Sequence, residues 1–187
     1  MKKGLLVVIS GPSGVGKGTV REKFIDNPEL NLAYSISMTS RERRKGERDG
    51  IDYFFVSRER FEEAIKNNEL LEWTEFVGNY YGTPAENVES LRKLGKNVLL
   101  EIEVEGAIKV KEKCPDALTI FIIPPSMEEL EKRIRGRRTE PEEIVQQRLG
   151  KANREMNMLS QYKYVVCNED AELAAELISV IIKRHML

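Results

Sequence analysis

The sequence is poor in the residues that build metal centres, disulfide networks and histidine-based catalytic sites. Cysteine occurs twice and histidine once in 187 residues. Cys114, Cys167 and His185 are isolated, with no Cys-x-x-Cys pair and no histidine cluster around them. These absences argue against a zinc site, a disulfide scaffold and acid/base chemistry by histidine.

Long apolar runs and a surplus of one charge are also missing. The longest apolar run, Leu118–Ile123, is far shorter than the roughly 18 to 20 residues that cross a bilayer. The 30 basic and 31 acidic side chains leave a net charge of −1, so the chain lacks the global basic field of non-specific nucleic-acid binding. The apolar stretch near the N-terminus meets Gly11 and Pro12 too soon for a signal peptide. We therefore expect an unprocessed cytoplasmic protein that binds neither membranes nor nucleic acid; the sequence identifies no protein partner.

What the sequence does contain is an alternation of strand-like apolar runs with amphipathic stretches. Strands are predicted over residues 5–10, 98–102, 118–123 and 164–167, each followed by a helical segment. This order is typical of βαβ units and predicts an α/β fold, a three-layer α/β/α core around a parallel sheet. The length corresponds to about one domain with room for an inserted lobe.

The alternation is interrupted twice. Residues 35–84 are rich in Arg, Glu, Gly and Tyr, with a strand-like piece over 52–56 and a helix over 58–67, and we interpret them as a small lobe inserted between core segments 1–34 and 85–187. Residues 135–139 crowd cations between two helices. The helix starts on either side have capping-box spacing, Ser126 with Glu129 and Thr139 with Glu142.

The strongest motif is the glycine-rich segment after the first predicted strand. Glycines let backbone N–H groups turn inward around an anion, and the following helix N-terminus and a lysine add positive charge. The segment therefore predicts a polyphosphate-binding P-loop, with ATP ligands among Gly11, Ser13, Gly14, Val15, Gly16, Lys17, Gly18 and Thr19. The usual Ser or Thr after the lysine is replaced by Gly18, so the hydroxyl that holds Mg²⁺ is predicted to be Thr19, directly or through a water.

A second set of anion ligands lies in the inserted lobe. Ser37, Arg41, Arg44 and Tyr53 fall within one stretch, and two arginines in a loop can converge on one phosphate. No Asn-Lys-x-Asp or Thr-Lys-x-Asp motif is present, which disfavours a switch GTPase. Two anion sites, one on each part, suggest a donor and an acceptor nucleotide.

Several spaced motifs together resemble the guanylate kinase family, from Leu5 to about Asp170. They are the P-loop, Arg41-x-x-Arg44-x-Gly46-Glu47, Asp52-Tyr53-x-Phe55-Val56, Leu71-Glu72-Trp73, Gly78–Thr83 and Pro124-Pro125-Ser126. The resemblance implies transfer of phosphate from ATP to GMP, and also to dGMP, with Mg²⁺. It further implies that residues 35–84 bind GMP and that residues 135–148 form a short lid.

The resemblance also assigns roles by position. Around GMP it places Ser37, Arg41, Arg44, Tyr53, Glu72, Tyr81 and Thr83, and near ATP it places Arg133, Arg137 and Asn168. The predicted catalytic residues are Lys17, Arg44, Arg137 and Arg148, which would neutralise charge on the transferred group. The chemistry of Glu72 supports its assignment, because guanine N1–H and N2–H₂ are adjacent donors that match the two oxygens of a carboxylate.

Two carboxylates at the end of the second core strand complete the prediction. Alternation places Glu101 and Glu103 on one side of the strand, at the carboxyl end where α/β sheets bind ligands. They could bind Mg²⁺ through water, contact the GMP ribose or orient Lys17. The less favoured alternative is that they are solvated residues that complement the dipole at a helix N-terminus.

Two alternative functions remain open from the sequence. One is a monophosphate kinase for another base, which Glu72 and Thr83 disfavour. The other is a non-catalytic guanylate-kinase-like binding module, which the intact Gly16-Lys17 pair disfavours.

Overall fold

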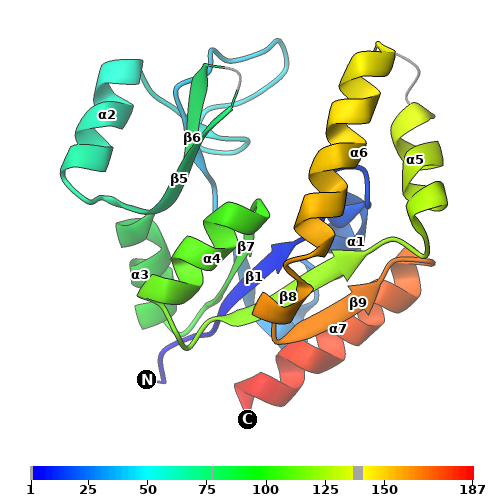
Figure 1. The fold of residues 1–187 in the computed structure, drawn as a ribbon. Helices are drawn as coiled ribbons and strands as arrows, with labels where there is room; N and C mark the ends of the chain where they lie inside the picture. Colours follow the sequence, from blue (N-terminus) through cyan, green and yellow to red (C-terminus); the bar gives the residue numbers. More distant parts are fainter. Residues whose placement is uncertain (1, 77, 137–140) are drawn as a thin grey trace.

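The computed structural model describes residues 2–76, 78–136 and 141–187, which form two sheets and their helices (Figure 1). The central sheet is fully parallel, with strand order β2-β7-β1-β8-β9. Its strands are β1 (Leu6–Ser10), β2 (Leu32–Tyr34), β7 (Asn97–Glu101), β8 (Leu118–Ile123) and β9 (Tyr164–Cys167). The predicted α/β fold with a parallel sheet is confirmed.

Helices cover both faces of this sheet, and alternate residues of β1 are therefore buried on opposite faces. Val7 and Ile9 belong to one apolar cluster, which takes in side chains of α1 (Lys17–Glu22), α5 (Met127–Arg135), α6 (Glu142–Met156) and α7 (Ala171–Met186). Leu6 and Val8 belong to the other, with side chains of α3 (Ala85–Lys93) and α4 (Val104–Lys113). A strand buried on both faces needs a continuous apolar run, which is what the sequence of β1 provides.

A second, four-stranded sheet has the order β4-β3-β6-β5. Its strands are β3 (Met38–Thr39), β4 (Phe54–Phe55), β5 (Leu70–Phe76) and β6 (Asn79–Pro84), and α2 (Arg58–Lys66) packs on it. Phe61, Ala64 and Leu70 form a small separate core there. All of these residues fall within the segment predicted to be an inserted lobe, whose boundaries stay a prediction.

Several element boundaries differ from the sequence prediction. The strand predicted over 52–56 is limited to Phe54–Phe55, and β7 ends at Glu101 rather than at residue 102. Helix α3 and the β5–β6 hairpin were not predicted. The hairpin's antiparallel pairing, which joins Trp73 to Gly82 and Thr74 to Tyr81, creates the wall of the second sheet that faces α6 (Figure 1).

One of the two predicted capping boxes has the expected backbone contact. The Ser126 hydroxyl accepts a hydrogen bond from the Glu129 N–H at 3.1 Å and caps α5, while the Glu129 carboxylate pairs with Arg133. Helix α6 begins at Glu142, and Pro141 is its N-cap residue. Thr139, the other predicted cap, lies outside the described residues.

Candidate active site

The glycine-rich segment forms a tight loop between the end of β1 and the start of α1. Gly16 has φ 94° and is the N-cap of α1, a left-handed conformation that favours glycine. A Cβ atom there would come within 2.7 Å of the Asn168 Nδ2 atom. Gly16 therefore meets both a conformational and a steric requirement of this loop.

Lys17 is folded back over the loop. Its Nζ atom donates to the Gly11 carbonyl oxygen at 2.7 Å. Burial lowers the pKa of Lys17 below its ordinary value, and the nearby carboxylates of Glu101, Glu155 and Glu103 oppose that effect. A partly desolvated ammonium group interacts more strongly with a phosphate than one in bulk water.

The loop is supported from behind by Arg133 and Asn168, two residues predicted to contact ATP. The Asn168 Nδ2 atom donates to the Val15 carbonyl oxygen at 2.8 Å, and an Arg133 N–H donates to the same oxygen at 3.3 Å. Arg133 also donates to the Asn168 carbonyl oxygen at 3.1 Å. The contacts described for these two side chains hold the loop in shape, and their contact with ATP stays a prediction.

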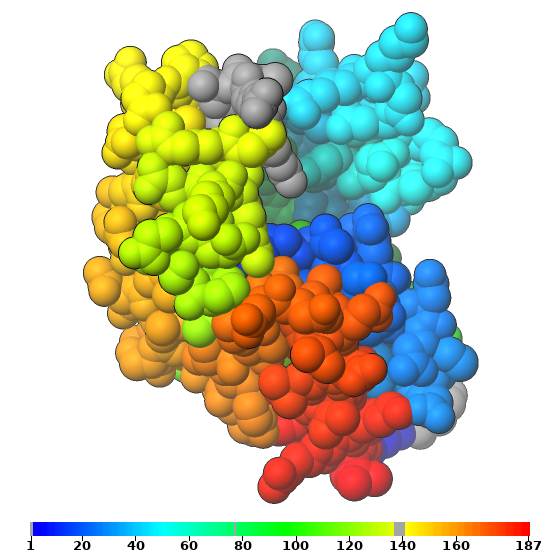
Figure 2. All heavy atoms as spheres, turned by 90° about the vertical axis from the view of Figure 1, so that its right-hand side faces the viewer, coloured from blue at the N-terminus to red at the C-terminus, as the bar shows by residue number. Residues whose placement is uncertain are grey.

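A cleft of about 640 Å³ opens above the loop, between the two sheets and α6. Figure 2 shows the cyan residues of α2 and its neighbouring loops and the yellow residues of α6 on opposite sides, above the blue N-terminal residues. Predicted site residues from both parts line it, namely Gly11, Ser13, Gly14, Gly16, Lys17, Gly18, Thr19, Ser37, Tyr53, Tyr81, Glu101 and Glu103. The structure therefore brings the P-loop and part of the predicted GMP set to one cavity.

Arg148 also reaches the loop, from α6. Its Nη2 atom donates to the Ser13 hydroxyl at 2.7 Å. A second predicted catalytic arginine, Arg137, lies outside the described residues, as does part of the predicted lid. Arg148 is thus the one arginine of that predicted pair whose position beside the loop is described.

Glu72 and Thr83 form a buried pair across the β5–β6 hairpin. The Thr83 hydroxyl donates to Glu72 Oε1 at 2.7 Å, and only 5% of Glu72 and 1% of Thr83 are exposed. Burial raises the pKa of Glu72, and the hydrogen bond from Thr83 partly offsets this rise. Alternation along β5 puts Glu72 on the same face as Thr74 and Phe76, both of which line the cleft. A carboxylate this buried, on the cleft side of its strand, is not a solvated surface residue.

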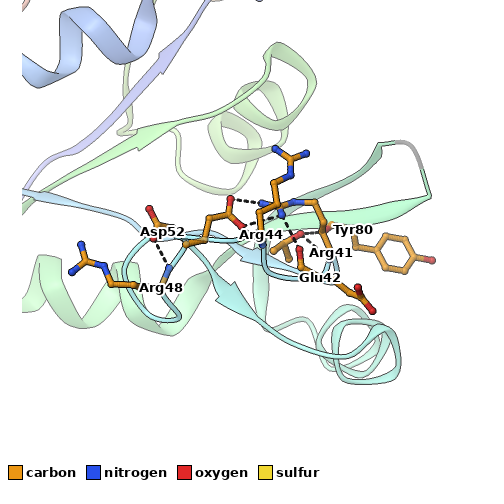
Figure 3. A network of polar contacts seen from close by, with 8 residues as sticks. Arg41, Glu42, Arg44, Arg48, Asp52 and Tyr80 are labelled. Carbon is orange, nitrogen blue, oxygen red and sulfur yellow. Dashed lines mark hydrogen bonds and ion pairs between the residues drawn. The ribbon is translucent and has the colours of Figure 1, made fainter.

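Two of the predicted phosphate ligands, Arg41 and Arg44, lie in one polar network (Figure 3). The Arg41 guanidinium donates to both oxygens of Glu47, at 3.0 and 2.8 Å, and the Arg44 backbone N–H donates to the same carboxylate at 2.8 Å. The Arg41 Cζ atom lies over the Tyr53 ring, 5.5 Å from its centre, and the Tyr53 ring packs edge-on against that of Tyr81. Glu47 thus fixes the loop that carries both arginines.

The placement of Glu101 and Glu103 on one strand was wrong. Strand β7 ends at Glu101, and Glu103 is the N-cap of α4, because the chain turns into the helix at that point. Both carboxylates still line the cleft, and each has a basic partner: Arg21 contacts Glu101 at 2.6 Å and Lys151 contacts Glu103 at 2.9 Å.

Lys151 and Glu155 line the cleft and were not predicted. Together with Arg148 they recur at spacings of three and four on α6, which places them on one face of the helix. Glu155 is buried, and burial raises its pKa. In the sequence, the pattern that indicates these residues is their helical spacing downstream of the cationic segment.

The residues that line the cleft offer oxygen ligands suited to a hard divalent cation. Thr19 is exposed beside Lys17, and Gly18 leaves open space around its Cα atom. Within residues 2–76, 78–136 and 141–187, no cluster of three or more His, Cys, Asp or Glu is placed to hold a metal by itself. A cation here would depend on the phosphates of a bound nucleotide for much of its coordination.

A parallel α/β sheet with a P-loop, facing a second sheet across one cleft, defines a P-loop nucleotide-binding protein. A sequence model described as guanylate kinase matches residues 3–185, and the chain belongs to the guanylate kinase family. Guanylate kinases of Bacillus cereus and Bacillus anthracis are each 54% identical over 181 residues, covering 97% of this chain and 88% of theirs. The crystal structure of guanylate kinase from Anaplasma phagocytophilum has a TM-score of 0.78 at 37% identity, covering 100% of this chain and 88% of that one.

None of the helices in the described part of the chain combines the length and hydropathy that crossing a bilayer requires.

Proposed function

We propose that this protein is an ATP:GMP phosphotransferase that produces ADP and GDP. Family membership over residues 3–185 supports the reaction, and the buried Glu72–Thr83 pair supports the choice of guanine. The observation that carries the proposal is that one cleft contains both a P-loop lysine and residues of the second sheet. The alternatives, a kinase for another base and a non-catalytic module, have no comparable support.

In this proposal the P-loop and the second sheet hold the two nucleotides. Lys17 binds the donor phosphates, and Arg148, which also lies at the loop, neutralises the charge that develops on the transferred group. Arg41, Arg44, Tyr53 and Tyr81 bind the GMP phosphate, and Ser37, with Glu72 and Thr83, contacts the base. The Tyr53 hydroxyl is a neutral donor at neutral pH, and burial raises its pKa still further above the ordinary value.

The reaction is an in-line displacement. An oxygen of the GMP phosphate forms a bond to the γ-phosphorus of ATP as the bond to the β,γ-bridging oxygen breaks, and ADP leaves with that electron pair. The protein aligns the two groups and neutralises the charge that spreads over the transferred group, which is the work that phosphoryl transfer requires. No side-chain nucleophile and no covalent intermediate are needed.

The metal in this proposal is Mg²⁺. The residues that would hold it are Thr19, directly or through a water, and the carboxylates of Glu101 and Glu103 through water; all three line the cleft. When bound, Mg²⁺ would neutralise phosphate charge and orient the donor. We place the reaction in the cytoplasm, as the sequence led us to expect.

A coupled assay of ADP release tests the activity, with ATP and each of GMP, dGMP, AMP, CMP and UMP supplied separately. We expect turnover with GMP and dGMP to exceed that with the other three. Lys17→Ala should abolish turnover, because the donor loses its lysine, while the acceptor site on the other sheet still binds GMP. Trp73 is the single tryptophan and lies next to Glu72, so its fluorescence can follow GMP binding. Equal turnover on all five nucleotides, or none, would refute the proposal.

A further inference from the structure

The space beside the Glu72 carboxylate is created by a glycine of another element. Gly106 is buried in the first turn of α4, in the central core. A Cβ atom on Gly106 would lie 2.6 Å from Glu72 Oε2, 3.1 Å from its Cδ and 3.5 Å from its Cγ. The first of these distances is well below van der Waals contact, so any side chain at position 106 would have to displace the carboxylate.

The carboxylate has little freedom to move away. Its other oxygen accepts the Thr83 hydroxyl at 2.7 Å, and Glu72 is 5% exposed. Rotation of the side chain would break this hydrogen bond and move a buried charge, which costs free energy. Glu72 is therefore held between Thr83 on one side and Gly106 on the other.

The helix cannot easily retreat either, because α4 is fixed to β5 on both sides of Glu72. The Lys109 Nζ atom donates to the Trp73 carbonyl oxygen at 2.9 Å, and the Lys113 Nζ atom donates to the Leu70 carbonyl oxygen at 3.0 Å. Strand β5 is at the edge of its sheet, so these lysines satisfy carbonyl groups on that strand. Gly106, Lys109 and Lys113 follow the i, i+3, i+7 spacing of one helix face.

We infer that Gly106 is a specificity-determining positioning residue, which fixes the Glu72 carboxylate where it can accept both guanine donors. This inference rests on the proposed function, because it gives Gly106 its effect through the base-reading role of Glu72. In this inference Gly106 acts only through its contact with the Glu72 side chain. Recognition of the base by the second sheet thus depends on a residue of the core, across the contact between α4 and β5.

Gly106→Ala tests the inference, with Gly150→Ala as the matched control. Gly150 also lies in a helix, but a Cβ there would meet nothing closer than the Arg154 Nη1 atom at 3.6 Å. For Gly106→Ala we expect KM for GMP to rise about 10-fold or more, as for the loss of one hydrogen bond to a charged group. KM for ATP should not change, and the GMP:AMP ratio of kcat/KM should fall. Gly150→Ala should match the wild type in all of these quantities.

A double mutant separates positioning from a general packing defect. Glu72→Asp shortens the side chain by one methylene and moves the carboxylate away from position 106. We therefore expect Gly106→Ala to cost much less in the Glu72→Asp background than in the wild type. If the two losses simply multiply, or if Gly106→Ala weakens ATP and GMP use alike, Gly106 has only a structural role and the inference is wrong.

Two further outcomes are distinguishable. If the Glu72→Gln variant turns over GMP as the wild type does, Glu72 does not read the base, and both that part of the proposed function and the role of Gly106 are refuted. If turnover depends on Glu72 but Gly106→Ala behaves like Gly150→Ala, the Gly106 inference alone is refuted. If Gly106→Ala does not fold, the Gly106→Ala, Glu72→Asp double mutant decides the question. Because the shorter side chain relieves the contact with position 106, we expect the double mutant to fold and to match the kcat/KM of Glu72→Asp for GMP. An unfolded double mutant would overturn the inference.

Discussion

Glu72 shows how a single residue can combine a cost in stability with a gain in specificity. Its carboxylate is buried beside Thr83, where a charge is more costly than in water. A bound base that donates two hydrogen bonds would compensate that cost, whereas adenine presents an acceptor at N1 and would be repelled. This difference is a physical basis for base choice.

Glu72→Gln should reverse part of that choice. The amide keeps one acceptor but places an NH₂ donor opposite a guanine donor. The binding free energy lost in the transition state is about 2 to 4 kcal/mol, so kcat/KM for GMP should fall roughly 30- to 1000-fold. AMP should improve relative to GMP, because the amide can donate to adenine N1. Steady-state kinetics with GMP and AMP measure the ratio, and KM for ATP is the internal control. An unchanged GMP:AMP ratio would move base recognition to Ser37 and Thr83.

The raised pKa of Glu72 predicts a pH dependence in which two quantities move in opposite directions. Burial makes the folded protein bind this proton at a higher pH than the unfolded chain does. As pH falls through the raised folded pKa, the carboxylate is neutralised and KM for GMP should rise. Over the window between the folded and unfolded pKa values, the contribution of Glu72 to the unfolding free energy should increase as pH falls.

Glu72→Gln is the control for both effects. Subtracting its pH profiles of KM and of unfolding free energy from those of the wild type isolates the contribution of Glu72. A wild-type KM for GMP that begins to rise only in the ordinary carboxyl range, near pH 4.3, would argue against a shifted group.

At the scale of elements, α6 presents Arg148 and Lys151 to the cleft. Arg148 contacts Ser13 at 2.7 Å, and Lys151 contacts Glu103 and lies 5.8 Å from the centre of the Phe76 ring across the cleft. We expect Arg148→Ala and Lys151→Ala to lower kcat more than either KM, because these cations would act on charge that develops during transfer. Arg154→Ala, an exposed position of the same helix, should have no effect. Changes confined to KM for ATP would make both residues ground-state binders.

The start of α1 carries a separate prediction about the metal. A Cβ atom on Gly18 would meet nothing within 4 Å, so Gly18→Ser adds a hydroxyl directly after Lys17 without a clash. If Thr19 or a water supplies the Mg²⁺ ligand in the wild type, the added serine hydroxyl should bind the cation more directly, and the variant should need less Mg²⁺ for half-maximal activity. Gly18→Ala is the matched control, since it adds the same atom without the hydroxyl. Equal Mg²⁺ requirements of the two variants would show that no protein hydroxyl at position 18 can contribute.

The elements also show which features could be predicted from the sequence. The core strands Leu118–Ile123 and Tyr164–Cys167 were predicted with their observed bounds, because short apolar runs between turns carry a local signal. Helix α3 was missed, and so was the β5–β6 hairpin, whose strand β5 mixes charged and apolar residues (Leu70–Phe76). Such a strand is specified by its partners and not by its own pattern.

The same distinction applies to the site. The P-loop could be predicted because its residues are contiguous, and its glycines are required by the local backbone conformation of the loop. Contacts between distant segments were not predictable, and the pairing of Lys151 with Glu103 and the space at Gly106 are examples. Both depend on how α4, α6 and β5 pack, which no local pattern specifies.

At the scale of the whole molecule, the second sheet and α6 stand on opposite sides of the cleft (Figures 1 and 2). The cleft has a volume of about 640 Å³ and is lined from both sides. Phosphoryl transfer needs the reacting atoms of two nucleotides about 3 to 3.5 Å apart. Nucleotides held on opposite walls meet this requirement if the walls approach one another when both sites are filled.

We therefore expect closure of the second sheet toward α6 when GMP and a non-hydrolysable ATP analogue are both bound. Nitroxide labels on Lys66→Cys of α2 and Asn153→Cys of α6 measure the distance between the two walls, in a Cys114→Ala, Cys167→Ser background. Labels at Glu112→Cys and Glu176→Cys, both on the central core, provide the control pair. The first distance should shorten with both ligands and change less with either alone, because each ligand contacts mainly one wall; the control distance should stay constant. A first distance that does not change would argue against closure without contradicting kinase activity, since the open cleft would then have to align both nucleotides by itself.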